Sequence, residues 1–256
     1  MSNIVISIVT ISRNDIQGLF KTLESVKAQD YEYIEHIIID GGSNDGTKEL
    51  LYSYQHTKIF SYISELDNGI SSAFNKGIDR SNGNLIFLLN SGDLLFSKNV
   101  VSEVVKTYLK HKWKCAVGSI VSSNYKSEEV FYNPPKLSSQ FLNYFMFLPH
   151  QGFFCETYMH KNYQFDESIK TSMDYDLFLR MLKDIEIFYL PIIVSKCQPG
   201  GISSQTQNRI DEQSIIRLKY ANTYSAKLIA KVVNIMIKAK SKLQISSPFI
   251  FSKKIL

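Results

Sequence analysis

The chain has 256 residues, of which 44% are hydrophobic and 21% charged, and its formal net charge at pH 7 is +5. This hydrophobic share can bury a core, and it excludes an intrinsically disordered chain, which combines low hydrophobicity with high net charge. The three cysteines, Cys115, Cys155 and Cys197, show no CxxC spacing. A zinc site or a redox dithiol is therefore not expected.

The N-terminal sequence predicts a cytoplasmic location. Residues 1–3 run directly into a strand-like segment, without the basic region, apolar stretch and cleavage site of a secretory signal. No apolar run reaches the roughly 20 residues that a membrane-spanning helix needs.

The first 100 residues alternate between strand and helix patterns. Apolar, β-branched strands are predicted over residues 4–11, 36–39, 59–63 and 85–89. Helical spacing fills the intervals, and we expect Thr47 to cap one helix and Ser71 or Ser72 the next. Strands that alternate with helices predict an open, mostly parallel, doubly wound α/β sheet.

The second half is harder to interpret. Its pattern predicts a helix over 100–108, a strand over 116–121, a helix over 174–182, a strand over 187–194, and one long helix or a pair of helices over 211–243. The aromatic side chains between 141 and 147 fit buried core better than an acceptor-binding wall.

Polar loops follow the predicted strands of the first half, and acids recur in them. The loops contain Asp40, Asp67 and Asp93, and the first strand ends in a polar run at 12–14. Because ligands bind beyond the carboxyl ends of the strands in open α/β sheets, we expect these loops to form one site. Each Asp alone could simply stabilise a turn, but the three together favour binding of a diphosphate with a divalent cation. Neither a GxGxxG nor a Walker A motif is present.

These segments resemble the family 2 glycosyltransferases of the GT-A fold. The resemblance is carried by the runs SIVTISRN (7–14), IIDGGSNDGT (38–47), ELDNGI (65–70), NKGI (75–78) and LNSGD (89–93). Within that family the chain is most similar to bacterial enzymes that synthesise surface polysaccharides, namely O-antigen (part of lipopolysaccharide), capsule and colanic acid. The resemblance implies a glycosyltransferase domain over 1–205, with a nucleotide-sugar-binding half (1–110), an acceptor-binding half (111–205) and a C-terminal helical extension (206–256).

The resemblance also implies roles for individual residues in binding a nucleoside-diphosphate sugar, most simply a UDP-sugar. Thr10 and Ser12 would lie against the nucleotide, Asp40 would accept a hydrogen bond from the base, and Asp67 would face the base or ribose. Asp93, which matches the last acid of the family's DxD-type motif, would bind Mg²⁺ or Mn²⁺ bridging the diphosphate. The remaining donor-binding candidates in this half are Asn14, Gly42, Lys76 and Ser91. Lys76 fits an exposed helix lysine equally well.

Two positions depart from the family pattern. Asn90 and Gly92 leave Asp93 as the only carboxylate of its loop, and Ser72 stands where close relatives often carry Asp. Because a single carboxylate remains in this metal-binding motif, the alternative to an enzyme is a non-catalytic nucleotide-sugar-binding or scaffold protein.

Asp174 is the predicted catalytic base. Residues 172–180 resemble the family segment in which an acid at the mouth of a helix deprotonates the acceptor hydroxyl; Asp174 matches that acid, and Asp176 is the second candidate. Helix capping is the alternative for both. The implied reaction is a direct displacement that inverts the anomeric centre. His150 and Gln151 are expected near the donor sugar or acceptor, and residues 200–203 in a loop that closes on the donor.

The C-terminal extension is basic and apolar at once. Lysines alternate with aliphatic residues from 227 onward, which fits an amphipathic helix on the inner face of the cytoplasmic membrane, where a polyprenyl-linked saccharide acceptor would be found. Packing against the catalytic domain fits the same pattern.

Other classes of protein fit less well. A nucleotidyltransferase would normally carry a Gly-rich loop with Lys or Arg after the first strand, and residues 12–15 do not form one. No nucleic-acid-binding motif is present, so no nucleic-acid partner is expected. The sequence leaves the oligomeric state open.

Overall fold

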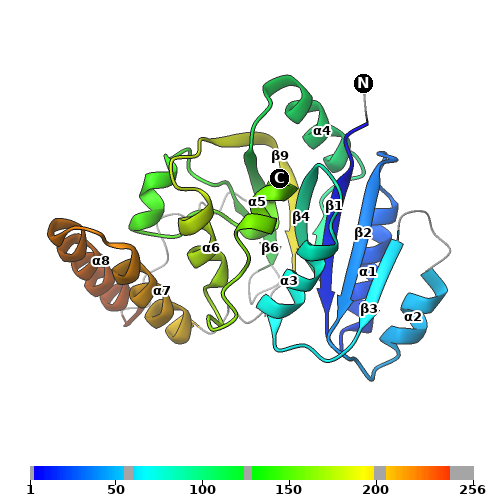
Figure 1. Cartoon of the computed structure of the whole chain (residues 1–256), viewed down its shortest axis with the longest axis horizontal. Helices are drawn as coiled ribbons and strands as arrows, with labels where there is room; N and C mark the ends of the chain where they lie inside the picture. Colours follow the sequence, from blue (N-terminus) through cyan, green and yellow to red (C-terminus); the bar gives the residue numbers. More distant parts are fainter. Residues whose placement is uncertain (1–2, 55–59, 124–128, 199–205, 243–256) are drawn as a thin grey trace.

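The computed structural model describes residues 3–54, 60–123, 129–198 and 206–242. Figure 1 shows a twisted sheet covered by helices, with a helical hairpin at one end of the molecule. The strands are β1 (Ile6–Ser12), β2 (Ile34–Asp40), β3 (Phe60–Ser64), β4 (Leu85–Asn90), β5 (Leu94–Leu95), β6 (Cys115–Ser123), β7 (Glu129–Tyr132), β8 (Phe153–Glu156) and β9 (Ile187–Cys197). The helices are α1 (Ile16–Lys27), α2 (Thr47–Tyr54), α3 (Ile70–Arg80), α4 (Val100–His111), α5 (Thr157–Asn162), α6 (Met173–Met181), α7 (Thr206–Tyr220) and α8 (Tyr224–Lys242), with 3₁₀ turns at Ser139–Asn143 and His150–Gly152.

The sheet is parallel in its first half and mixed in its second. Its order is β3-β2-β1-β4-β8-β6-β9-β5, with β7 on β6. β1 pairs in parallel with β2 and β4, and β2 with β3, as the alternating pattern predicts. β8 then pairs antiparallel with both β4 and β6. This four-residue strand was not predicted, because so short an apolar run shows no period that separates a strand from a helix.

Helices cover both faces of the sheet, which confirms the doubly wound α/β prediction. Val9 of β1 packs in one core cluster with Phe74 of α3 and Phe178 of α6. Its neighbour Ile8 points to the other face and packs with Val101 of α4. A side chain at Gly77 would clash with Val9, so this glycine lets α3 lie close against β1.

Helix starts differ from the sequence prediction at two places. Ser71 and Ser72 do not cap α3, because the helix already begins at Ile70, behind Gly69 with its φ of +117°. Thr47 does not cap α2 either; its hydroxyl donates to the carboxylate of Asp45 over 2.6 Å. In the loop before each of these helices, the short side chain of an aspartate accepts the hydrogen bond that closes the local turn.

The C-terminal segment forms a pair of helices, which settles the alternative of one long helix. Arg217 of α7 is buried and donates to Asn234 of α8, and Lys238 pairs with Asp211 at 2.7 Å. Figure 1 shows α7 between α8 and the rest of the molecule. Within the described residues, none of the helices is long and apolar enough to cross a membrane.

Candidate functional site

The carboxyl ends of four neighbouring strands meet at one edge of the sheet. The strand register places Ser12 beside Asp40, and Asp40 beside Ser64. On the other side of β1, Ile11 lies beside Asn90. The expectation that the polar loops converge is confirmed, because parallel strands deliver their ends to the same edge.

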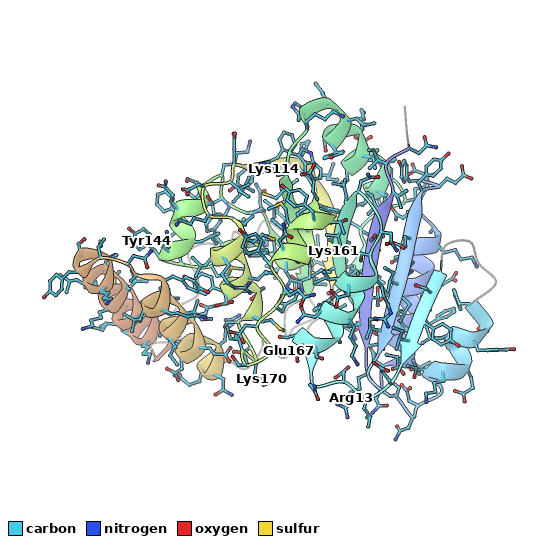
Figure 2. All side chains as sticks on the ribbon, in the orientation of Figure 1. Arg13, Lys114, Tyr144, Lys161, Glu167 and Lys170 are labelled. Atoms are coloured by element: carbon cyan, nitrogen blue, oxygen red, sulfur yellow. The ribbon has the colours of Figure 1, made fainter. Side chains whose placement is uncertain are left out.

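The other half of the chain reaches the same edge. Figure 2 shows Arg13, which follows β1, at the lower edge of the molecule together with Glu167 and Lys170, which precede α6. A cavity there is lined from both halves, by residues at the start of α3, by the loop before α6, and by Glu212 of α7.

The end of β1 holds three of the predicted donor-binding residues. Thr10 is fully buried and its hydroxyl lies 3.0 Å from Nε2 of His36. Ser12 is also buried, and its hydroxyl has no hydrogen-bond partner within the described residues. Asn14 adopts a left-handed φ of 50° and accepts a hydrogen bond from the backbone of Asn44. The unsatisfied hydroxyl of Ser12 is what a site that awaits a polar ligand would contain.

Asp40 is held by hydroxyl groups from two loops. It is fully buried, it accepts from the hydroxyl of Ser43, and Ser64 donates to its other oxygen over 2.5 Å. The backbone amide of Ser43 donates to the same carboxylate at 3.1 Å. A hydrogen bond from a nucleotide base to Asp40 stays a prediction, and one of these hydroxyls would have to turn away to admit it.

Asp67 lies against the glycines that follow β2. Its carboxylate accepts from the amide of Gly69 at 2.9 Å, a hydrogen bond typical of a turn. The same carboxylate lies so close to Gly41 that a side chain at Gly41 would clash with it. Gly42 has a φ of +75° and packs against Leu66, so a side chain there would be strained. These close approaches fix the loop after β3 beside the loop after β2.

Lys76 holds the loop after β3 in place. Its ammonium pairs with Glu65 at 2.6 Å and donates to the carbonyl of Leu66. This ion pair lowers the pKa of Glu65. The side chain of Lys76 is 26% exposed, which keeps the alternative of an ordinary helix lysine at the surface open, and its contact with phosphate stays a prediction.

Both carboxylate oxygens of Asp93 accept hydrogen bonds from other residues of the protein. It is 4% exposed; Oδ1 accepts from the amide of Gln198 at 2.8 Å, and Oδ2 accepts from the side chain of Asn90 at 3.2 Å. Burial raises the pKa of Asp93, and the bond from Gln198 opposes that rise. Ser91 of the same loop donates to Asp15 at 2.8 Å, which anchors the loop to the start of α1.

The chemistry around Asp93 fits a cation that is shared with a ligand. Within the described residues, no group of three or more His, Cys, Asp or Glu side chains could enclose a metal ion. Mg²⁺ in nucleotide sites is commonly held by one or two carboxylates, substrate phosphates and water, and Mn²⁺ accepts the same oxygen ligands. A single buried carboxylate such as Asp93 would meet that requirement if a diphosphate bound beside it, and a cation there would offset the cost of its burial.

A chain of polar contacts connects Asp93 with Asp174. Asn90 Nδ2, which donates to Asp93, lies 3.1 Å from Nε2 of His150. Nδ1 of His150 lies 3.7 Å from Oδ2 of Asp174. Because the Nδ2 nitrogen of Asn90 can only donate, Nε2 of His150 accepts, and in the neutral imidazole the proton is then on Nδ1 and faces Asp174. The predicted metal ligand and the predicted base thus belong to one site.

Asp174 and Asp176 have different environments in α6. Asp174 has a side chain that is 30% exposed, and it accepts from the amide of Tyr175. Asp176 is fully buried and receives Arg180 at 2.7 Å, Lys219 at 3.2 Å and the hydroxyl of Tyr220 at 2.8 Å. A carboxylate that is already saturated by three donors is unsuited to take a substrate proton, so Asp176 is a structural residue.

Glu212 is a residue that the sequence analysis missed. Its carboxylate accepts from three consecutive backbone amides, 170 to 172, at 2.8 to 2.9 Å, and from the hydroxyl of Thr171 at 2.6 Å. Partial burial alone would raise the pKa of Glu212, but these hydrogen bonds lower it. Glu212 lies on α7 and fixes the loop that leads into Asp174, a contact over about 40 positions that no local pattern reveals.

Two other predicted features are less defined. The backbone carbonyl of Gln151 accepts from the hydroxyl of Ser195 at 2.6 Å, and a contact of its side chain with the donor sugar or acceptor stays a prediction. The predicted closing loop at 200–203 lies outside the described residues.

Known proteins resemble this chain in sequence. An uncharacterized glycosyltransferase of Mycobacterium tuberculosis is 40% identical over 102 residues, which covers 40% of this chain and 38% of that protein. An uncharacterized glycosyltransferase of Rickettsia typhi is 25% identical over 98% of this chain and 80% of its own length. The chain thus spans well under half of the first of these relatives.

Solved structures share the fold. TarS of S. aureus in complex with UDP-GlcNAc has a TM-score of 0.70 at 12% identity, over 94% of this chain and 76% of that one. The mannosyltransferase PcManGT of Pyrobaculum calidifontis, in complex with GDP-Man and Mn²⁺, has a TM-score of 0.64 at 12% identity, over 97% of this chain and 78% of that one. The fold is therefore that of the GT-A glycosyltransferases. The sequence profile described as glycosyl transferase family 2 matches residues 7–165, which is more than half of the chain, so this protein belongs to glycosyl transferase family 2.

Proposed function

We propose that the protein transfers a sugar from a nucleoside-diphosphate sugar, with a UDP-sugar as the first candidate, to a saccharide acceptor, with inversion of the anomeric centre. The observation that carries this proposal is the contact chain from Asp93 through Asn90 and His150 to Asp174. It places a carboxylate suited to the diphosphate and a carboxylate suited to the acceptor on opposite sides of one imidazole.

Asp174 acts as the base in this proposal. It lies in the first turn of α6, where the helix dipole stabilises the ionised carboxylate. One of its oxygens is engaged by the amide of Tyr175, and the other faces Nδ1 of His150. The partly exposed carboxylate takes the proton of the acceptor hydroxyl as the oxygen attacks the anomeric carbon. His150 orients Asp174, and the partly exposed Asp174 afterwards releases its proton to solvent.

Asp93 and the strand ends bind the donor. Ser12, Asn14, Asp40 and Asp67 surround the nucleotide, with Thr10, Gly42, Lys76 and Ser91 as supporting positions. A bound Mg²⁺ or Mn²⁺ at Asp93 would offset the negative charge that develops on the departing nucleoside diphosphate. TarS with UDP-GlcNAc and PcManGT with GDP-Man and Mn²⁺ support a donor and a cation of these classes.

The acceptor belongs to the second half of the chain. We assign the nucleotide-sugar half to 1–110, the acceptor half to 111–205 and the extension to 206–256, and we take the acceptor to be a polyprenyl-linked saccharide of surface polysaccharide synthesis on the inner face of the membrane. Similarity to a chondroitin synthase of Pasteurella multocida, 27% identical over 69% of this chain and 19% of that protein, supports a polymer pathway.

Calorimetric titration tests the proposal. The purified chain is titrated with UDP, GDP and dTDP, first with Mn²⁺ and then with EDTA. We expect one nucleotide to bind in the presence of the metal and to lose most of its affinity with EDTA, after which its sugars are screened with lipid-linked acceptors. If no nucleotide binds under either condition, the enzymatic proposal is wrong and a scaffold role takes its place.

A further inference from the structure

Helix α8 has a buried face and, opposite it, an exposed apolar face. Ala230 and Asn234 are buried, on the side where α8 packs against α7. The opposite side is exposed: Ile235 is 68% exposed and Met236 65%. We call the exposed apolar residues of this face the α8 stripe, and they are Tyr224, Leu228, Ile229, Val232, Ile235 and Met236. At 3.6 residues per turn they fall within one sector of about 140°, so they form a continuous surface.

The charges of α8 are all of one sign. The helix contains no Asp or Glu, and its lysines Lys227 and Lys231 are exposed and lie along one side of the α8 stripe. Lys238 differs from these two lysines, because it forms an ion pair with Asp211 of α7. An apolar face bordered by exposed cations complements a surface that is apolar below and anionic above.

We propose that the α8 stripe seats the protein on an anionic lipid bilayer, with Lys227 and Lys231 against the phosphate headgroups. For the identity of the lipid-linked acceptor, this rests on the proposed function. A second copy of the chain suits the surface less well, because two stripes in contact would bring the lysines of both helices together without an acid to pair with them. In this proposal α8 packs on α7 through one face and meets the membrane through the opposite face.

The seating would also place the catalytic helix. α7 lies between α8 and α6, and its Lys219 and Tyr220 contact Asp176 in α6. Glu212 of α7 holds the loop that leads into Asp174. A bilayer that fixes α8 therefore fixes the base at a set position from the headgroups, where a lipid-linked sugar would present its hydroxyl.

Vesicle sedimentation with the full chain tests the proposal. Vesicles of phosphatidylglycerol and phosphatidylethanolamine are compared with vesicles of phosphatidylcholine alone. We expect binding to the anionic vesicles and little to the neutral ones. The double variant Val232→Glu/Ile235→Glu should lose at least about 30-fold in partitioning, because it places two charges in the apolar contact.

The matched control changes the same number of exposed apolar residues elsewhere. Tyr52 of α2 and Leu109 of α4 are 64% and 47% exposed, so Tyr52→Glu/Leu109→Glu alters the net charge equally and should bind vesicles nearly as well as the wild type. Lys227→Gln/Lys231→Gln should weaken binding about 30-fold at low salt and flatten its salt dependence. Thermal unfolding of each variant confirms that it is folded.

Three outcomes would overturn the proposal. They are absence of binding to the anionic vesicles, equal binding by the α8 variant and the control, or a concentration-dependent dimer that Val232→Glu/Ile235→Glu dissolves. The last result would assign the stripe to a second copy. Nucleotide titration of the same variants is independent of lipid, so loss of vesicle binding with intact nucleotide binding separates this surface from the donor site.

Discussion

Asp40 and Asp174, the acids proposed to serve the donor and the acceptor, are held in opposite ways. Asp40 on the donor side is fully buried, and neighbouring hydroxyls occupy its oxygens. Asp174 on the proposed acceptor side is partly exposed, and its oxygens face the adjacent amide and His150. The acid proposed to shape the binding pocket is thus fixed by its surroundings, whereas the acid proposed to take a proton is left accessible.

The substitution Asp174→Asn tests this contrast most directly. An amide of the same shape cannot accept the proton of the acceptor hydroxyl, so we expect kcat to fall by about 10³-fold or more while the Kd of the nucleotide is unchanged. Turnover and calorimetry are measured on the same preparation. Asp184→Asn, a change at an exposed acid outside the site, is the control. Near-normal turnover in Asp174→Asn would show that another group is the base.

We expect Asp93→Asn to weaken nucleotide binding without affecting the base. The amide keeps the volume and the hydrogen bond from Gln198 but removes the negative charge, so Mn²⁺-dependent affinity for the nucleotide should fall at least about tenfold. In EDTA the variant and the wild type should bind alike. If Mn²⁺ strengthens nucleotide binding to the same extent in both proteins, Asp93 does not hold the cation.

Glu212→Gln sharpens the comparison within the acceptor side. A glutamine has one acceptor oxygen where the loop supplies four donors, so we expect a loss of about 1–3 kcal/mol in the free energy of unfolding and a lower kcat with unchanged nucleotide affinity. Urea unfolding and turnover are measured together. Glu103→Gln, which removes an acid paired with Lys106 on the surface of α4, should leave both values near those of the wild type. Weakened nucleotide binding in Glu212→Gln would contradict a role confined to the acceptor side.

The last prediction concerns stability at acid pH and lies outside the site. Burial lowers the pKa of His36 to about 3 and that of His160 to about 4. Since the unfolded chain takes up these protons near pH 6.5 and the folded chain does not, the free energy of unfolding should fall as pH drops from 6.5 toward 4. His160→Gln should reduce that slope by up to about 1.4 kcal/mol per pH unit. His111→Gln, at an exposed site, should leave the slope unchanged.

The sequence predicted the donor side better than the acceptor side for a physical reason. Asp40, Asp67 and Asp93 follow strands whose apolar runs are readable, and parallel strands align their ends, so pattern alone implied that they meet. Asp174 was found only through resemblance to a family. The contact of Glu212 with the loop before α6, and the antiparallel insertion of β8, depend on segments far apart in the chain. Such contacts leave no local period in the sequence.

The polar contacts of α7 have a consequence for where the enzyme can be cut. The family profile ends at residue 165, which is before α6 and Asp174. A fragment that stopped there would lack Asp174, the proposed base, and one that stopped at 205 would leave Asp176 with Arg180 but without Lys219 and Tyr220, and the loop before α6 without Glu212. A fragment that stopped at 220 would in turn remove Asn234 of α8, to which the buried Arg217 of α7 donates. The smallest fragment expected to fold with an intact loop before Asp174 therefore includes both α7 and α8.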